Sequence, residues 1–456
     1  MKQTFTTIGL LFFLAVATHA KPLKAGFARA VITPEQPTWL SGYAARTKPS
    51  EGKLHDLHAK ALALEDERGY RVVIVTTDLL GFSKDLADPI VAAAQKQYGL
   101  RREQLLLTSS HTHTAPVVRS NLIGAYALDE EQAARVTAYA KLLHERIVSV
   151  IGAAIRDLAP ANVSLAHGTG SFAINRRERT PQGAIKIGLN PQGVVDHDIP
   201  ALIVESLDGQ LRGVFFAYAC HNTTLTDKIM SVSGDYAGFA QAAFESAHPN
   251  TTAMFAMGCG ADINPNPRGT VELGQQHGNS LAAAVDKALS GERRTLAGRF
   301  KTAFATIPLA YAKLPTREEL KAMQSDSSGS NVFKQRLATR WLARYDREGK
   351  LPASYPYPIH ALQLGTNFTL IALGGEVVTD YALRLKKELG TQGLMVLGYA
   401  NEVMAYIPSA RMYQEGGYEV VDSMIYYDHP TTWTPALEEQ IIGKAKAMAA
   451  QVGRKP

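Results

Sequence analysis

The stretch Gln104–Thr114, QLLLTSSHTHT, joins a short apolar run to a pair of histidines. Gln104–Thr108 predicts a buried strand that ends at Ser109. His111 and His113 follow at once, and residues two apart on an extended segment point to the same side. Imidazole nitrogens are frequent ligands of catalytic metals, and α/β sheets place their ligands at strand ends. The stretch therefore predicts a metal-binding pocket at a strand end, with two exposed loop histidines as the alternative.

Apolar runs and amphipathic segments alternate on both sides of this stretch. Tyr70–Thr77 is nearly continuously apolar, which suits a strand buried on both faces. Ser83–Tyr98 and Asp129–Leu158 have helical periodicity. Further strands are predicted at Ala201–Glu205, Val214–Ala219, Thr252–Met257, His360–Leu364, Phe368–Leu373 and Leu394–Gly398, and further helices at Tyr236–Ala247, Val271–Leu289 and Pro435–Gln451. The pattern predicts an α/β fold of mixed β-sheets packed together and flanked by helices.

Two segments in the last third of the chain interrupt this alternation. The region Pro315–Gly349 predicts two charged surface helices. Leu351–Pro358, LPASYPYP, is rich in proline and tyrosine, so we expect an internal loop there.

Composition and the N-terminus limit the function classes. The chain has 456 residues, 46% of them hydrophobic, which suits a globular protein with a large core. Its net charge is +6, and the charged residues are mixed along the chain rather than grouped in blocks. A nucleic-acid partner is therefore not expected. Lys2 and the apolar run Ile8–Ala17 resemble a signal peptide over residues 1–20, cleaved near Ala20. We expect a mature chain of residues 21–456, secreted or periplasmic, without a transmembrane segment.

Three later strand ends carry further candidate ligands. His221 follows the strand Val214–Ala219 in the way that His111 follows its own strand, which favours a second metal ligand over an ordinary buried histidine. Asp262 and Asn264 come after Thr252–Met257, where a plain Asx/Pro turn is equally consistent. Glu376 follows Phe368–Leu373; it could complete a metal site, act as a base, or only stabilise a helix N-terminus.

The chain has two cysteines, Cys220 and Cys259, each just after one of these strands. Two cysteines exclude a disulfide scaffold in a protein of this size. If the two strands are neighbours, the thiols could form one disulfide, with two buried free thiols as the favoured alternative.

Taken in order, these motifs resemble the neutral (non-lysosomal) ceramidases, zinc-dependent amidases that cut the N-acyl bond of ceramide. The likeness runs from about Gly26 to about Tyr426. Its landmarks are Gly26–Ala30, Gly42–Ala44, Ser110–Pro116, Ile174–Arg176, Ala219–Asn222, Gly234–Gly238, Ala261–Asn266, Gly375–Glu376 and Asn401–Ile407. Nine such strings in the family's order are far more specific than any one alone. Barrel amidohydrolases and metallophosphoesterases also contain an HxH pair, but the spacing of strands and the early position of the motif do not suit them.

The resemblance implies a set of site residues. The zinc ligands would be His111, His221, Glu376 and Tyr406, and His113 and Arg176 would line the pocket and hold the scissile carbonyl or its oxyanion. A small-molecule or lipid substrate is expected, with peripheral membrane contact conceivable and the oligomeric state open.

The chain departs from the family at the nucleophile. The family's serine aligns with Asn264, which has no hydroxyl and cannot form an acyl-enzyme. The resemblance also leads us to expect that the chain lacks the family's C-terminal immunoglobulin-like domain. We therefore expect a zinc-dependent amidohydrolase that uses zinc-bound water, with Asp262 or Asn264 orienting it. The alternatives are a zinc hydrolase of the same fold that acts on an ester, an N-acyl sugar or amino acid, or a glycan, and a non-catalytic metal-binding homologue.

Overall fold

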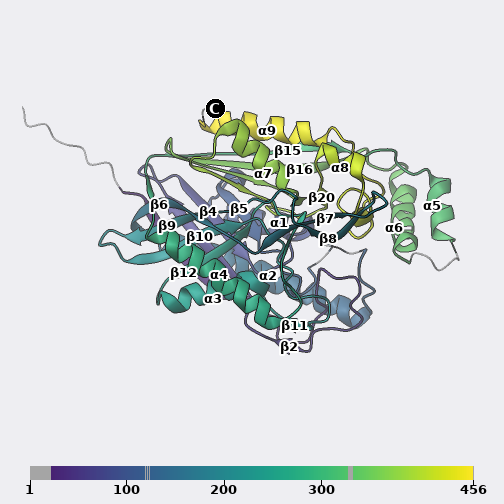
Figure 1. The fold of residues 1–456 in the computed structure, drawn as a ribbon, viewed down its shortest axis with the longest axis horizontal. Coiled ribbons are helices and arrows are strands. Elements are labelled where there is room, and N and C mark those ends of the chain that lie inside the picture. Colours follow the sequence, from purple (N-terminus) through teal and green to yellow (C-terminus); the bar gives the residue numbers. More distant parts are fainter. Residues whose placement is uncertain (1–21, 119, 121, 123, 327–331, 455–456) are drawn as a thin grey trace, which may run out of the picture.

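The computed structural model describes residues 22–118, 120, 122, 124–326 and 332–454. The predicted signal peptide at residues 1–20 lies outside this part. Two large β-sheets lie in the middle of the molecule, with helices on both outer sides (Figure 1). The predicted α/β class, with mixed sheets packed together and flanked by helices, is confirmed.

The larger sheet has nine strands and mixed directions. Its order is β12 (Thr252–Met257), β10 (Leu211–Tyr218), β9 (Asp198–Ser206), β6 (Ala159–Thr169), β1 (Lys24–Val31), β3 (His58–Glu65), β4 (Arg71–Thr77) and β5 (Leu105–Ser109), while β14 (Arg294–Leu296) pairs with β6. The pairs β10–β12 and β4–β5 are parallel, and the others are antiparallel. The two end strands β5 and β12 also contact each other, so the sheet curls round. This curl brings together strand ends that are far apart in the strand order.

The second sheet packs against one face of the first. It contains β15 (Phe300–Ala310), β16 (Ser354–Leu364), β17 (Phe368–Leu373) and β19 (Leu394–Leu397). Because successive side chains of a strand point to opposite faces, each buried strand contributes to two cores. Leu62, Ile74 and Leu106 pack with Leu370 and Met395 between the sheets. Their neighbours in the sequence, such as Ala61, Val73 and Leu107, pack against the helices instead.

Helices cover the outer faces of both sheets. Helices α1 (Lys84–Tyr98) and α2 (Glu130–Arg156), and the pair α3 (Asp235–Ala247) and α4 (Val271–Leu289), lie over the large sheet. Helices α7 (Thr379–Leu389) and α9 (Leu437–Val452) lie over the small one (Figure 1). The hairpin of α5 (Arg317–Gln324) and α6 (Val332–Glu348) stands at one end, as the two predicted surface helices. None of the helices in the described ranges combines the length and hydropathy needed to cross a bilayer.

Short elements connect these layers and surround one end of the sheets. They are β2 (Gly52–Lys53) with β11 (Ser231–Val232), the sheet β13 (Ile263–Pro265), β7 (Ala173–Arg179) and β8 (Ile185–Asn190), the pair β18 (Glu376–Val377) and β20 (Tyr406–Ile407), helix α8 (Ala410–Glu415), and two 3-10 turns, η1 (Arg102–Gln104) and η2 (Asp422–Ile425).

The predicted loop at Leu351–Pro358 is wrong, because strand β16 begins at Ser354. Residues 354–358 pair with β15, while β17 pairs only from Ile359 onward. The two prolines, Pro356 and Pro358, therefore lie where β16 has a neighbouring strand on one side only. Their missing N–H groups leave no backbone hydrogen bond of the sheet unmade on the open side.

The two cysteines follow neighbouring strands, as the disulfide alternative required. Tyr218 of β10 is the register partner of Met257 of β12, so Cys220 and Cys259 follow at matching positions. Both are nevertheless free and fully buried, which confirms the favoured alternative of two buried thiols.

Candidate metal centre

His111 lies two residues beyond the end of β5 and is fully buried. Its φ of 58° is in the left-handed region, so the segment is not extended as the sequence reasoning assumed. The ring Nδ1 lies 2.7 Å from the carbonyl oxygen of Leu80, which requires the proton on Nδ1. The lone pair of His111 is therefore on Nε2. A second hydrogen bond of this kind is the usual way in which proteins orient a metal-binding imidazole.

His221 is held in the same way at the end of β10. Its backbone N–H donates to Ile263, and its Nδ1 lies 3.0 Å from the carbonyl oxygen of Gly260. A Cβ added to Gly260 would lie 2.6 Å from the carbonyl carbon of Ala219, so only glycine allows this close approach. Nε2 again carries the lone pair. It lies 3.2 Å from Nε2 of His111.

Glu376 and Tyr406 come from the two short parallel strands β18 and β20, where they are register partners. Helix α7 begins only at Thr379, so Glu376 is not the helix N-terminal acid of the alternative interpretation. Its Oε2 lies 3.2 Å from Nε2 of His111 and 3.1 Å from Nε2 of His221. The Tyr406 hydroxyl lies 3.4 Å from Nε2 of His221.

These distances fit a metal ion. Two imidazole lone pairs and a carboxylate oxygen face one another, and Glu376 Oε2 is buried without a hydrogen-bond donor. Such an arrangement of acceptors repels itself unless a cation lies between them. Ligands about 2.0 Å from a tetrahedral zinc are about 3.3 Å apart, and the measured separations are 3.1–3.4 Å. The donor set of nitrogen and oxygen atoms also suits zinc.

Electrostatics at the centre favour neutral histidines and an ionised glutamate. Burial lowers the pKa of His221 to about 4, with the nearby Arg176 adding to the effect. Burial also lowers the pKa of His113, to well below its usual value. Burial alone would raise the pKa of Glu376, but positive charge on the imidazoles of His111 and His221 lowers it to well below its usual range. A bound cation would supply that positive charge when both imidazoles are neutral. A metal needs these protonation states in its ligands.

His113 belongs to the same cluster as the predicted ligands. Its Nε2 lies 3.2 Å from Nε2 of His111, and the nitrogens of His111, His113 and His221 lie within 4.8 Å of one another. Nδ1 of His113 is buried and has no hydrogen-bond partner. The geometry thus brings Nε2 of His113 as close to the cluster as a ligand, while Nδ1 is packed away from it against Gly42.

Arg176 lies on β7 and reaches the centre from the side. Its guanidinium donates to the Tyr406 hydroxyl over 3.1 Å and to Glu419 over 2.9 Å, and lies 3.5 Å from Nε2 of His221. Burial alone would lower the pKa of Arg176, but Tyr406 and Glu419 outweigh it and raise the pKa well above its usual value. Arg176 is therefore a fixed positive charge beside the candidate metal ligands.

Asp262 does not point into this site, contrary to the role predicted for it. One carboxylate oxygen accepts from Asn175 over 3.0 Å and the other from the backbone N–H of Thr379 over 2.8 Å. Asp262 thus ties β7 to the start of α7 and has a structural role. Asn264, on β13, does line the cavity, described below, that opens beside the histidine cluster. Its Oδ1 accepts from the hydroxyl of Thr223 over 3.4 Å.

Sequence reasoning missed several residues of the site. The Tyr427 hydroxyl donates to Oε1 of Glu376. Glu419 bridges Arg176 and Arg177, with 2.5 Å to the latter, and is fully buried. Neither residue lies in a motif with metal-binding or catalytic spacing. The only signal in the sequence is the concentration of tyrosines and acidic residues over 413–428.

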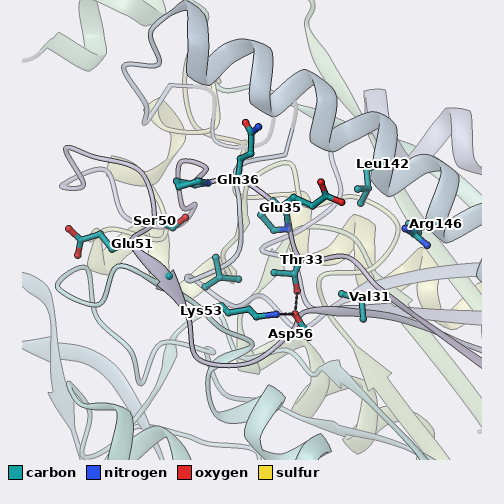
Figure 2. A pocket seen from close by; sticks show the side chains of 14 residues that line it. Val31, Thr33, Glu35, Gln36, Ser50, Glu51, Lys53, Asp56, Leu142 and Arg146 are labelled. Atoms are coloured by element: carbon teal, nitrogen blue, oxygen red, sulfur yellow. Dashed lines mark hydrogen bonds and ion pairs between the residues drawn. The ribbon is translucent and has the colours of Figure 1, made fainter.

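A cavity of about 250 Å³ opens next to the cluster, lined by His113, Arg176, His221, Asn264 and Tyr406 among others. A larger groove of about 730 Å³ lies elsewhere, between residues 31–37, 50–56 and helix α2 (Figure 2). There Lys53 and Thr33 both bind Asp56, and the lining contains neither histidine nor cysteine. The functional site is therefore identified by the side chains that line a cavity rather than by its volume. We call the smaller cavity, beside the histidines, the active-site cavity.

Comparisons with known proteins point to one family. The family model described as neutral/alkaline non-lysosomal ceramidase, N-terminal, matches residues 24–292, more than half of the chain. The neutral ceramidase of Drosophila melanogaster is 25% identical over 281 residues, covering 58% of this chain and 38% of that protein. That of Mycobacterium tuberculosis is 23% identical over 462 residues, covering 83% and 70%. The chain thus matches little more than a third of the Drosophila protein.

A solved structure shares the fold. The neutral ceramidase from Pseudomonas aeruginosa superposes with a TM-score of 0.74 at 19% identity, covering 96% of this chain and 76% of that one. A second structure, titled as a ceramidase complexed with C2, gives 0.73 at 18% identity. At these identities the likeness establishes the fold alone.

Proposed function

The chain belongs to the neutral/alkaline non-lysosomal ceramidase family, and from this premise we propose that it is a zinc-dependent amidohydrolase that cleaves an N-acyl bond with water. The signal-like residues 1–20 favour action outside the cytoplasm. The observation that supports the proposal most is the convergence of the lone pairs of His111 and His221 with Oε2 of Glu376 at the edge of the active-site cavity. Zinc bound there supplies a Lewis acid that polarises a carbonyl and makes water a nucleophile near neutral pH.

The residues around the metal ligands have roles in this reaction. Arg176, fixed by Glu419, offers a guanidinium N–H to negative charge that develops on the scissile carbonyl oxygen. His113 is kept neutral by burial, and its Nε2, which faces the candidate metal ligands, is placed to take a proton from the attacking water and pass it to the leaving amine.

Asn264 at this position favours direct attack of water on the acyl carbon in a single displacement. Its carboxamide has no ionisable hydroxyl, and its Oδ1 already accepts from Thr223. Hydrolysis therefore proceeds without an acyl-enzyme, which requires a nucleophilic side chain.

Metal analysis combined with activity tests the proposal. We expect about one zinc per chain, loss of amide hydrolysis after chelation, and recovery on adding zinc. His221→Ala and Glu376→Gln should each reduce zinc content and lower kcat/KM by at least about 100-fold. His144→Ala, on the remote helix α2, is the matched control and should resemble the wild type. A zinc-free purified protein that is fully active, or unchanged activity in His111→Ala, would disprove the proposal.

A further inference from the structure

The active-site cavity has a polar wall built from Thr223, Asp227, Asn264 and Arg268. Hydrogen bonds join three of these residues: Arg268 donates to the Thr223 hydroxyl over 3.4 Å, and that hydroxyl donates to Asn264 over 3.4 Å. Neither Asp227 nor Arg268 forms a salt bridge with any described residue. One positive and one negative side chain therefore face the cavity with hydrogen-bonding capacity to spare.

The other walls are apolar and aromatic. Ala44, Ala45, Leu122 and Ala125 form a continuous apolar wall, since the backbone N–H of Gly42 donates to the Tyr126 hydroxyl over 2.7 Å and joins the two segments. Tyrosine rings from Tyr43, Tyr418 and Tyr426 complete the lining. The apolar character of this wall suits an acyl group.

The size of the cavity limits the substrate further. Its volume of about 250 Å³ is below the range of roughly 300–1,000 Å³ for pockets that bury drug-sized ligands. An amide with a short acyl group and one ring suits a cavity of this size, whereas the two long chains of a membrane lipid would have to extend beyond it.

We propose that the substrate is a small N-acyl amine with a short acyl group and a hydroxyl-rich amine side, of which an N-acetylated amino sugar is the type. This inference rests on the proposed amidohydrolase function. A hydroxyl accepts from Arg268 and donates to Asp227 or Asn264, whereas a carboxylate can only accept and leaves Asp227 without a donor. Sugar rings also present flat C–H faces that pack on tyrosine rings. In the reaction, the oxygen of water bonds to the acyl carbon, the C–N bond breaks, and the amine nitrogen takes a proton.

Kinetics on a substrate panel test this inference with the zinc-loaded full chain. The panel contains N-acetylglucosamine, N-hexanoylglucosamine, N-acetylglycine, and a C16 ceramide in detergent micelles. We expect kcat/KM for N-acetylglucosamine to exceed that for the ceramide at least 100-fold, and to fall at least tenfold when the acyl chain grows to six carbons.

A variant of the polar wall tests the contact with the hydroxyls. Asp227→Asn should lower the ratio of kcat/KM for N-acetylglucosamine to that for N-acetylglycine at least tenfold, as expected for one charged hydrogen bond. The increase in KM should account for most of this change. Glu51→Gln, in the separate groove of Figure 2, is the control and should leave the ratio unchanged.

The outcomes separate the two proposals. If the zinc-loaded protein cleaves none of the four amides, the amidohydrolase function fails and this inference fails with it. If the C16 ceramide or N-acetylglycine is the best substrate, the amidohydrolase function stands and this inference is overturned. An unchanged substrate ratio in Asp227→Asn also overturns the assignment of the polar wall.

Discussion

Gly42 leaves the space that the imidazole of His113 occupies. A Cβ on Gly42 would lie 2.4 Å from Cγ and Nδ1 of His113, and the φ of +91° is itself unfavourable for other residues. We expect Gly42→Ala to displace the imidazole and lower kcat about 10- to 100-fold, with zinc content unchanged. Steady-state kinetics together with metal analysis measure both. Gly52→Ala, where an added Cβ meets nothing within 4 Å, is the control. A wild-type kcat in Gly42→Ala would show that the position of His113 is unimportant.

Tyr427 orients a candidate metal ligand without touching the metal position itself. Its hydroxyl donates to Oε1 of Glu376, leaving Oε2 turned towards the histidines. Removing such a second hydrogen bond typically costs 10- to 100-fold in metal affinity. We therefore expect Tyr427→Phe to weaken zinc binding by about that factor in a chelator competition assay.

A neighbouring tyrosine provides the control for this prediction. The ring of Tyr399 lies 4.4 Å from that of His111, but its buried hydroxyl has no partner. Tyr399→Phe should therefore leave zinc affinity nearly unchanged. Equal affinities in the two variants would show that the hydrogen bond from Tyr427 does not orient Glu376.

The sequence predicts the site residues only where chemistry coincides with a strand end. His111 and His221 follow apolar strands, which makes them visible. Tyr406 is identified only through the family resemblance, because a tyrosine on a two-residue strand has no distinctive pattern. Asp262 shows the opposite failure. A carboxylate after a strand can face a pocket or satisfy backbone N–H groups, and only the tertiary fold decides between them.

A buried ion pair links β3 to α3 across the large sheet. Lys60 is 3% exposed, and its Nζ donates to Glu245 over 2.7 Å and to the carbonyl of Ala253 over 2.8 Å. Glu245→Gln would leave the ammonium buried without its counter-charge, which costs about 3–5 kcal/mol. We expect a loss of that size in the free energy of urea unfolding.

The exposed pair between Arg317 and Asp346 is the matched control. It lies on the α5–α6 hairpin, so Asp346→Asn should change the free energy of unfolding by less than about 1 kcal/mol. Similar losses in Glu245→Gln and Asp346→Asn would mean that burial does not decide the strength of the Lys60 pair.

Secondary structure is predicted best where a single periodicity dominates. β12, β17 and α4 match their predicted bounds because their apolar residues are continuous or helically spaced. β15 is not predicted, since only three of its eleven residues are buried and it has no apolar run. The predicted strand His360–Leu364 is shorter than β16, because the sequence alone cannot assign the prolines of Ser354–Pro358 to an open sheet edge. Pairing partners, rather than local preference, determine such strands.

The curl of the large sheet is what assembles the site. His111 follows β5, the strand at one end of the order, and His221 follows β10, which is next to the strand at the other end. The segment 398–401 bridges the gap, since Gly398 donates to Met257 of β12 and Asn401 donates to Leu107 of β5. This segment leads on to Tyr406, so one connection both joins the sheet ends and delivers a candidate ligand. Long-range closure of this kind has no local sequence signal.

Glu402 makes the stability of the whole molecule depend on pH. It lies just after this bridging segment, is 8% exposed, and accepts a hydrogen bond from the hydroxyl of Tyr355 in the second sheet. Burial raises its pKa to about 7, and the hydrogen bond from Tyr355 only partly opposes the effect. The folded state thus holds this proton more tightly than the unfolded state, where the pKa is near 4.5. Its stabilising contribution is complete below about pH 4.5 and is lost as the pH rises through 7.

Glu402→Gln removes this dependence while keeping an oxygen that can accept from Tyr355. At about 1.4 kcal/mol per pKa unit, the wild type should lose at most about 3 kcal/mol relative to the variant between pH 4.5 and 8. Urea unfolding of both proteins across this range measures the difference, which cancels the titration of all other groups. The two curves should converge at low pH, separate from about pH 4.5 upwards, and run parallel above about pH 7. Parallel curves over the whole range would mean that Glu402 titrates normally, and that the junction between the two sheets admits water.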